Sequence, residues 1–161
     1  MIQLKDTNDL ENSRAIISNL VGYFGQIERD YNISVSVHTS NRYIDIFNPI
    51  LKDYNNHVIP YCLVIKSNSL LSIKCVNCQR MVTASFARKI PGKDQSQKAG
   101  AYFGQCCFGV EEFVLPIRTE GVPVGFISVT AYSSDLDATR RKAEKQFGRT
   151  GIYPKGYDEA L

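Results

Sequence analysis

Residues 102–130, YFGQCCFGVEEFVLPIRTEGVPVGFISVT, decide the fold of this chain. They belong to three strand-like segments, which cover residues 100–107, 112–118 and 122–132. The connections between them, Phe108-Gly109 and Thr119-Glu120-Gly121, are short turns. Strands joined by such short turns must run antiparallel, because a parallel pair needs a long crossover. The stretch therefore predicts three neighbouring strands of an antiparallel sheet.

Two further strands are predicted on the N-terminal side. Ile33, Val35 and Val37 alternate with polar residues, which is the period of a half-buried strand. Residues 43–47 read as a shorter strand within a region rich in Asn, Asp and Tyr. Together these segments predict an antiparallel sheet of about five strands.

Apolar residues at helical spacing predict helices around this sheet. The longest pattern spans residues 8–30 and gives one apolar stripe, which either packs on its own domain or supports a homodimer. Pro60 opens a short helix over residues 61–65, and residues 68–89 form a second long helix. A last, polar helix is expected to end near Gly148.

Length and composition suit one globular domain. The chain has 161 residues, of which 43% are hydrophobic and 22% charged, so it can bury a core of its own. We expect an α+β domain over residues 1–148. Residues 149–161 contain Pro154 and two glycines, and we expect them to form a linker toward an absent output domain.

Charge and hydropathy exclude several classes of partner. No apolar run approaches the roughly 20 residues that span a bilayer. The N-terminus, MIQLKDTND, lacks the basic region and apolar block of a secretory signal, so we expect a cytoplasmic protein with reduced thiols. The net charge of +3 is spread along the chain, and we expect no direct nucleic-acid contact from it.

The five cysteines are the residues best able to carry chemistry. Their pattern is C-x12-C-x2-C-x27-C-C, at Cys62, Cys75, Cys78, Cys106 and Cys107. Cys75 and Cys78 are neighbours on one helix, whereas two adjacent cysteines on a straight strand would point to opposite faces. Four thiolates could hold zinc or an iron–sulfur centre. The alternatives are inert buried thiols and redox-active thiols.

A catalytic cysteine would need a base beside it. The chain has two histidines, His38 and His57, and neither is linked in sequence to a cysteine. We expect His38 to be solvated and His57 to be an ordinary loop residue. The sequence therefore favours a non-enzymatic domain.

Three segments together resemble the PocR sensory domain of AraC-type bacterial transcription regulators. They are YCLVIKS from Tyr61, the C-V-N-C motif from Cys75, and residues 102–132; the resemblance covers about residues 10–148. Its strongest part matches the family at Cys106, Gly109, Glu112, Pro116, Ile117 and Gly125. The chain departs from the family at Cys107, where a histidine is usual, and it lacks the Gly-Gln that often closes the last strand.

The resemblance implies a PAS-like antiparallel sheet with helices on one side, and a covalently linked DNA-binding domain. It also implies a ligand that is a small hydrocarbon derivative such as a propanediol. A diol needs an apolar pocket with a few polar groups. The polar groups could be Tyr102, Glu112 and Ser128, and the walls Phe108, Val114 and Phe126. For each of these residues the alternative is an ordinary surface, edge or core position.

The sequence thus predicts a ligand-sensing domain with a site near the cysteine cluster. The alternative is a metal-binding or redox-sensing module built on the same cysteines.

Overall fold

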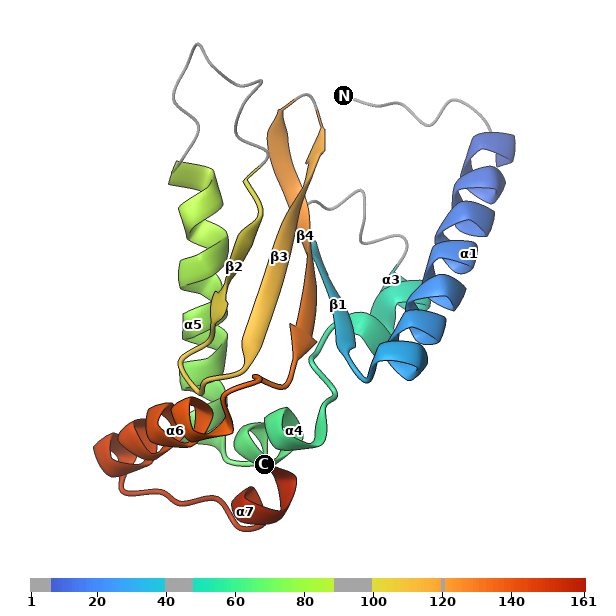
Figure 1. Ribbon diagram of the computed structural model, residues 1–161. Coiled ribbons are helices and arrows are strands. Elements are labelled where there is room, and N and C mark those ends of the chain that lie inside the picture. The colour runs from blue at the N-terminus through green and yellow to red at the C-terminus, as the bar shows by residue number, and fades with distance from the viewer. Residues whose placement is uncertain (1–6, 40–47, 89–99, 120) are drawn as a thin grey trace.

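The computed structural model describes residues 7–39, 48–88, 100–119 and 121–161 (Figure 1). Helices and an antiparallel sheet are mixed in it, as expected for an α+β fold. The helices are α1 (Thr7–Tyr31), α3 (Asn48–Leu51), the 3-10 helix η1 (Lys52–Tyr54), α4 (Pro60–Lys66), α5 (Ser69–Arg88), α6 (Leu136–Thr150) and α7 (Tyr157–Ala160). Across the ranges just given, no helix is long and apolar enough to cross a membrane.

The sheet has four strands in the order β1-β4-β3-β2, all antiparallel. They are β1 (Ser34–Thr39), β2 (Tyr102–Gln105), β3 (Glu111–Thr119) and β4 (Val122–Ala131). The predicted sequence of antiparallel strands is confirmed. The described residues contain four strands, not five, and the predicted strand at residues 43–47 lies outside them.

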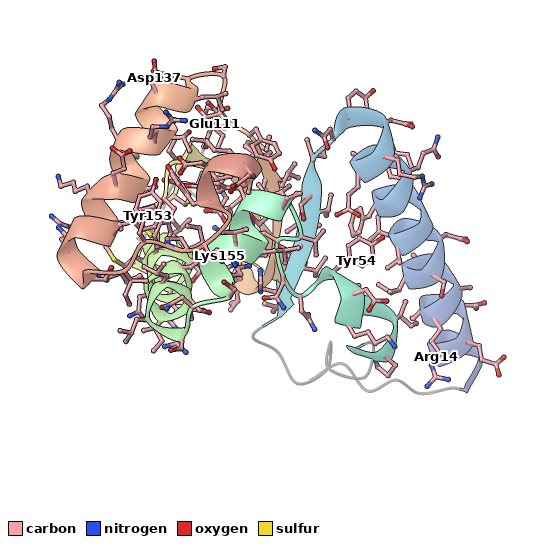
Figure 2. All side chains as sticks on the ribbon, turned by 90° about the horizontal axis from the view of Figure 1, so that it is seen from below. Arg14, Tyr54, Glu111, Asp137, Tyr153 and Lys155 are labelled. Atoms are coloured by element: carbon pink, nitrogen blue, oxygen red, sulfur yellow. The ribbon has the colours of Figure 1, made fainter. Side chains whose placement is uncertain are left out.

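One face of the sheet is apolar and carries the N-terminal helix. Val35 and Val37 of β1 are buried there with Phe24 of α1 and Leu51 of α3. Tyr54 of η1 lies toward α1 (Figure 2), and its hydroxyl donates to the Val21 carbonyl at 3.1 Å. Burial of aliphatic side chains against this face is what holds α1 to the sheet.

The opposite face is polar, although it is buried. Its residues come from alternate positions of β1, β3 and β4, because successive side chains of a strand point to opposite faces. At most 3% of each is exposed: Ser34, Ser36, Glu112, Ser128 and Thr130. The segment before α4 and the helix α5 lie over this face. Helices therefore pack on both faces, whereas the resemblance implied helices on one side.

The C-terminal residues pack on the domain. The last long helix runs to Thr150, beyond the predicted end at Gly148, and Gly151 then takes a left-handed conformation with φ of +67°. Tyr157 is 1% exposed, and its ring packs edge-on against Phe147 at a centroid distance of 4.9 Å. Residues 149–161 thus contribute to the core instead of extending from it as a free linker. An output domain linked to this one stays a prediction.

The turn after β2 requires glycine at position 109. The φ of Gly109 is +88°, and a Cβ atom there would lie 2.5 Å from Thr139 Cα. We expect Gly109→Ala to lower the free energy of unfolding by at least about 2 kcal/mol, since backbone strain and a steric clash add. Urea denaturation measures this.

Gly148→Ala is the matched control. Gly148 lies within α6, and a Cβ atom there would meet nothing within 4 Å. This change should stabilise the chain by about 0.5–1 kcal/mol, because alanine is the better helix former. Equal denaturation midpoints for the two variants would contradict the close approach of Gly109 to Thr139 of α6.

Candidate functional site

A cavity of about 20 Å³ lies where the polar face of the sheet meets α4, α5 and the turn at residues 106–110. Its lining residues are His57, Tyr61, Cys62, Ile65, Cys75, Cys78, Gln79, Cys106, Phe108, Val110 and Glu112. This volume holds about one water molecule. The lining combines thiols, apolar side chains and a few polar groups.

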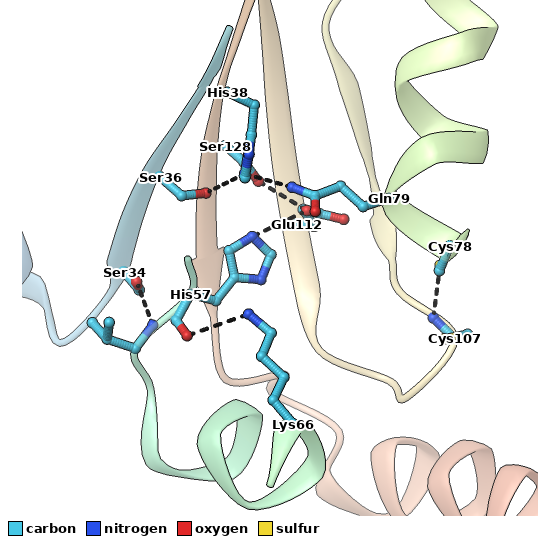
Figure 3. Close-up of polar contacts among 11 residues, drawn as sticks. Ser34, Ser36, His38, His57, Lys66, Cys78, Gln79, Cys107, Glu112 and Ser128 are labelled. Atoms are coloured by element: carbon cyan, nitrogen blue, oxygen red, sulfur yellow. Dashed lines mark hydrogen bonds and ion pairs between the residues drawn. The ribbon is translucent and has the colours of Figure 1, made fainter. Parts of the chain in front are cut away.

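Four cysteines from three separate segments line this cavity. Cys62 comes from α4, Cys75 and Cys78 from α5, and Cys106 from the turn after β2. Cys107 follows in the same turn and contacts Cys78 (Figure 3). All five cysteines are free.

The expectation that Cys106 and Cys107 point to opposite faces of a strand is wrong. β2 ends at Gln105, and the Cys106 N–H donates to the Val110 carbonyl at 2.8 Å while Gly109 N–H donates to the Cys106 carbonyl at 3.0 Å. These bonds close a turn, in which the alternation of a strand no longer applies. Both cysteines can therefore face α5.

Cys78 has an environment that favours the thiolate. The Cys107 side chain and the Cys107 backbone N–H, which donates to the Cys78 sulfur at 3.2 Å, lower the pKa of Cys78 to about 6 against the opposing effect of burial. Burial instead raises the pKa of Cys62 and Cys75, and raises that of Cys106 to about 12. The Cys107 sulfur also lies 3.8 Å from the Lys74 carbonyl. Cys78 is thus the one cysteine of the five whose pKa is lowered.

Glu112 forms the polar end of the cavity. Only 3% of it is exposed, and its Oε1 accepts a hydrogen bond of 2.9 Å from the Ser128 hydroxyl. Burial raises the pKa of Glu112, while the Ser128 hydroxyl and Lys66 oppose that rise. The carboxyl group therefore has one oxygen held by the sheet and faces the cavity from β3.

His57 lies beside this carboxyl group, with Nε2 at 3.5 Å from Glu112 Oε1 (Figure 3). Burial, together with Lys66 and His38, lowers the pKa of His57 to about 3, so its imidazole is neutral at physiological pH. The contact is therefore not an ion pair, and 3.5 Å is long for a hydrogen bond. Among the described residues, His57 Nε2 is buried and has no hydrogen-bond partner.

His38 positions the rim of the cavity and is not solvated as expected. It is half-buried, and its Nε2 accepts a hydrogen bond of 2.6 Å from the Gln79 amide. The Ser36 hydroxyl lies 3.2 Å from the same nitrogen. β1 thereby orients Gln79, a cavity residue on α5.

The six predicted ligand-binding residues separate into two groups. Phe108 and Glu112 line the cavity, and Ser128 supports Glu112 from the neighbouring strand. Tyr102, Val114 and Phe126 are not among the residues that line it. They occupy the same face of the sheet farther along the strands, where Tyr102 pairs with Val114, Val114 with Ser128, and Phe126 with His38.

Sequence reasoning missed five cavity residues: His57, Tyr61, Ile65, Gln79 and Val110. The helical period from Cys75 places Gln79 one turn farther along α5, and this signal could have identified it. No local sequence pattern predicts that His57 lines the cavity. His57 is buried because the loop before α4, to which it belongs, folds over the sheet.

The sequence predicts a metal site at the five cysteines. Within the described ranges, no group of three or more His, Cys, Asp or Glu side chains is arranged to hold a metal ion. Zinc or another thiolate-bound metal stays a prediction.

Comparison with known proteins gives no relative. No family model matches the chain, and neither does a curated protein or a solved structure. The resemblance to the PocR sensory domain therefore stays a prediction.

The buried, neutral His57 predicts a pH dependence of stability. The unfolded chain binds a proton at His57 below pH 6.5, whereas the folded chain does so only near pH 3. Protonation of His57 therefore favours the unfolded chain, so the free energy of unfolding is highest above pH 6.5 and decreases as the pH falls below it. From pH 7 to pH 5 we expect a loss of about 2 kcal/mol relative to His57→Gln. Denaturation of both proteins at several pH values measures the difference.

The His57→Gln comparison isolates this residue, because Glu112, Lys66 and His38, the charged and titratable groups around it, are present in both proteins. Parallel curves of stability against pH would mean that His57 is accessible to water.

Proposed function

We propose that this chain is a small-molecule-sensing domain, and that it binds a neutral, hydroxylated hydrocarbon derivative in the cavity. The proposal rests on one observation. His57 Nε2 is buried beside Glu112 and lacks a hydrogen-bond partner in the described part of the chain. Buried polar atoms nearly always have a hydrogen-bond partner, so a molecule in the cavity can supply the one that His57 Nε2 needs.

A hydroxyl group fits the two polar atoms of the cavity. It can donate to the Glu112 carboxylate and accept from His57 Nε2–H in the same position. An anionic ligand would meet the Glu112 carboxylate, and a cationic one would approach Lys66, whose Nζ lies 3.5 Å from the His57 carbonyl. The remaining walls, including Ile65, Phe108 and Val110, suit a short hydrocarbon.

The size of the cavity means that binding changes the conformation. About 20 Å³ is too little for a three-carbon diol, so the rim at Cys78 and Gln79 has to move away from the turn at residues 106–110. A ligand that binds only the opened form shifts the population toward it. A sensor requires this differential binding.

Tyr61 connects the cavity to the C-terminus. It lines the cavity, its hydroxyl donates to the Phe108 carbonyl at 2.8 Å, and its ring packs against Tyr157 of α7 at 5.7 Å. A movement of α4 on ligand binding would therefore be transmitted to residues 149–161. The family resemblance supports a PAS-like sheet and, as the output, a covalently linked DNA-binding domain of an AraC-type regulator in the cytoplasm.

A homodimer through α1 belongs to the same proposal. This helix exposes Ile16, Leu20 and Tyr23, which are 66%, 39% and 59% accessible. Apolar side chains on one helix are typical of an interface, and size-exclusion chromatography of Leu20→Glu beside the unmodified chain tests it.

A thermal-shift series tests the ligand class. We expect 1,2-propanediol and 1-propanol to raise the melting temperature, because a ligand of the folded state stabilises it, and propionate to have no effect. At about 1.5 kcal/mol per non-hydrogen atom, so small a ligand cannot bind more tightly than the micromolar range, and the series must extend to millimolar concentrations. No shift with any neutral hydroxylated compound would refute the proposal.

The second candidate is a metal-binding module, which the four cysteines around one cavity favour. Metal analysis of the purified chain distinguishes the two. One equivalent of zinc, lost in Cys75→Ser together with folding, supports the metal module; protein that is folded without metal excludes it.

A further inference from the structure

Cys78 and Cys107 face each other from two separate elements, α5 and the turn after β2 (Figure 3). The Cys107 N–H donates to the Cys78 sulfur at 3.2 Å, and the Cys107 thiol donates to the Lys74 carbonyl at 3.8 Å. Both residues are half-buried and within reach of a small reagent, whereas Cys62 is only 6% exposed. A backbone N–H that donates to a sulfur stabilises negative charge there.

We propose that Cys78 and Cys107 form a peroxide-reactive thiol pair, in which a hydroperoxide oxidises Cys78 and Cys107 then closes a disulfide with it. The geometry carries this inference: two free cysteines are in contact across a helix and a turn, with the Cys107 backbone nitrogen 3.2 Å from the Cys78 sulfur. It does not depend on the ligand proposed above.

The chemistry needs only the hydroperoxide as oxidant. The Cys78 thiolate attacks the terminal peroxide oxygen, the O–O bond breaks, and the peroxide leaves as an alcohol or water after taking up a proton; the Cys78 sulfur becomes a sulfenic acid. The Cys107 sulfur then attacks the Cys78 sulfur and loses its proton. The S–O bond breaks, the S–S bond forms, and the hydroxide leaves with that proton as water.

Cys107 is a better resolving partner than Cys75, although Cys75 is closer in sequence. Residues three apart on a helix have Cβ atoms about 5–6 Å apart, and a disulfide requires about 3.5–4.5 Å. A bond between Cys75 and Cys78 would therefore distort α5. The turn carrying Cys107 already brings its backbone nitrogen within hydrogen-bond distance of the Cys78 sulfur.

The disulfide would join α5 to the turn at the rim of the cavity, since Cys78 lines it. Oxidation would then hold the rim closed and weaken binding of the diol. This last consequence rests on the proposed function, while formation of the disulfide does not.

Peptide mapping by mass spectrometry tests the pair. The reduced full chain is treated with a slight excess of hydrogen peroxide, remaining thiols are blocked with N-ethylmaleimide, and the digest is analysed. We expect a cross-linked peptide joining Cys78 and Cys107, and alkylation of Cys62. A cross-link of Cys78 to Cys75 or Cys106, or an unmodified Cys78, would overturn the proposal.

One variant completes the test. In Cys107→Ser the sulfenic acid at Cys78 should persist and be trapped by dimedone, whereas in the unmodified chain the disulfide should replace it. A further measurement needs no variant: brief iodoacetamide treatment should alkylate Cys78 on the order of tenfold faster than Cys62. Equal rates for these two cysteines would contradict the assignment of Cys78 as the nucleophile.

Discussion

Tyr157→Ala is expected to lower the free energy of unfolding by about 3–5 kcal/mol, the range for removing a large aromatic side chain from a core. Tyr157 is 1% exposed, and three rings surround it: those of Tyr61, Phe147 and Tyr153, with centroids 5.7, 4.9 and 5.3 Å away. The lost contacts would leave a void beneath α4 and α6. Urea denaturation followed by circular dichroism measures the change.

Tyr31→Ala is the control for this prediction. Tyr31 ends α1 and is 72% exposed, so its removal should change stability by no more than about 0.5 kcal/mol. If Tyr157→Ala unfolded at the same urea concentration as Tyr31→Ala, the C-terminal segment would be separable from the domain, as a linker would be.

Glu112→Gln is expected to weaken binding of 1,2-propanediol about 10- to 100-fold. A hydrogen bond from a ligand hydroxyl to a buried carboxylate is worth about 1.5–3 kcal/mol, most of which a neutral amide does not supply. The fold should not lose stability, because burial already disfavours the charged form of Glu112. Calorimetric titration of the variant and the unmodified chain gives both affinities.

Glu111→Gln is the matched control, since it makes the same chemical change one residue away. The Glu111 carboxylate accepts a hydrogen bond of 3.0 Å from the Ser133 hydroxyl and does not line the cavity. Alternation along β3 places it on the other face of the sheet. Equal losses in both variants would mean that the carboxylate of Glu112 is not the ligand's partner.

The sheet could be predicted from the sequence because its signals are local. Alternation in β1 and the short turns that join β2, β3 and β4 each depend on a few neighbouring residues. The packing of residues 149–161 could not be predicted, since their glycines and proline suggest a linker. Contact of Tyr157 with Phe147 is what orders them, and no local pattern shows that contact.

The cysteine cluster was predictable for a similar reason. Helical spacing puts Cys75 and Cys78 on one side of α5, which packs toward the turn that carries Cys106. The position of the cavity was not predictable. Tyr102, Val114 and Phe126 were predicted to contact the ligand, but the loop before α4 folds over the sheet at His57, and the cavity lies closer to the turn.

The most direct test of the receptor proposal is a titration of the isotope-labelled chain with 1,2-propanediol, followed by amide NMR spectra. We expect saturable shifts concentrated at residues 57–65, 75–79 and 106–112, which line or flank the cavity, with smaller changes in α7 and none in the first turns of α1. Spectra that stay unchanged at high millimolar diol, or shifts that never saturate and spread evenly over the chain, would contradict the proposal that the thiol-lined cavity is a receptor site.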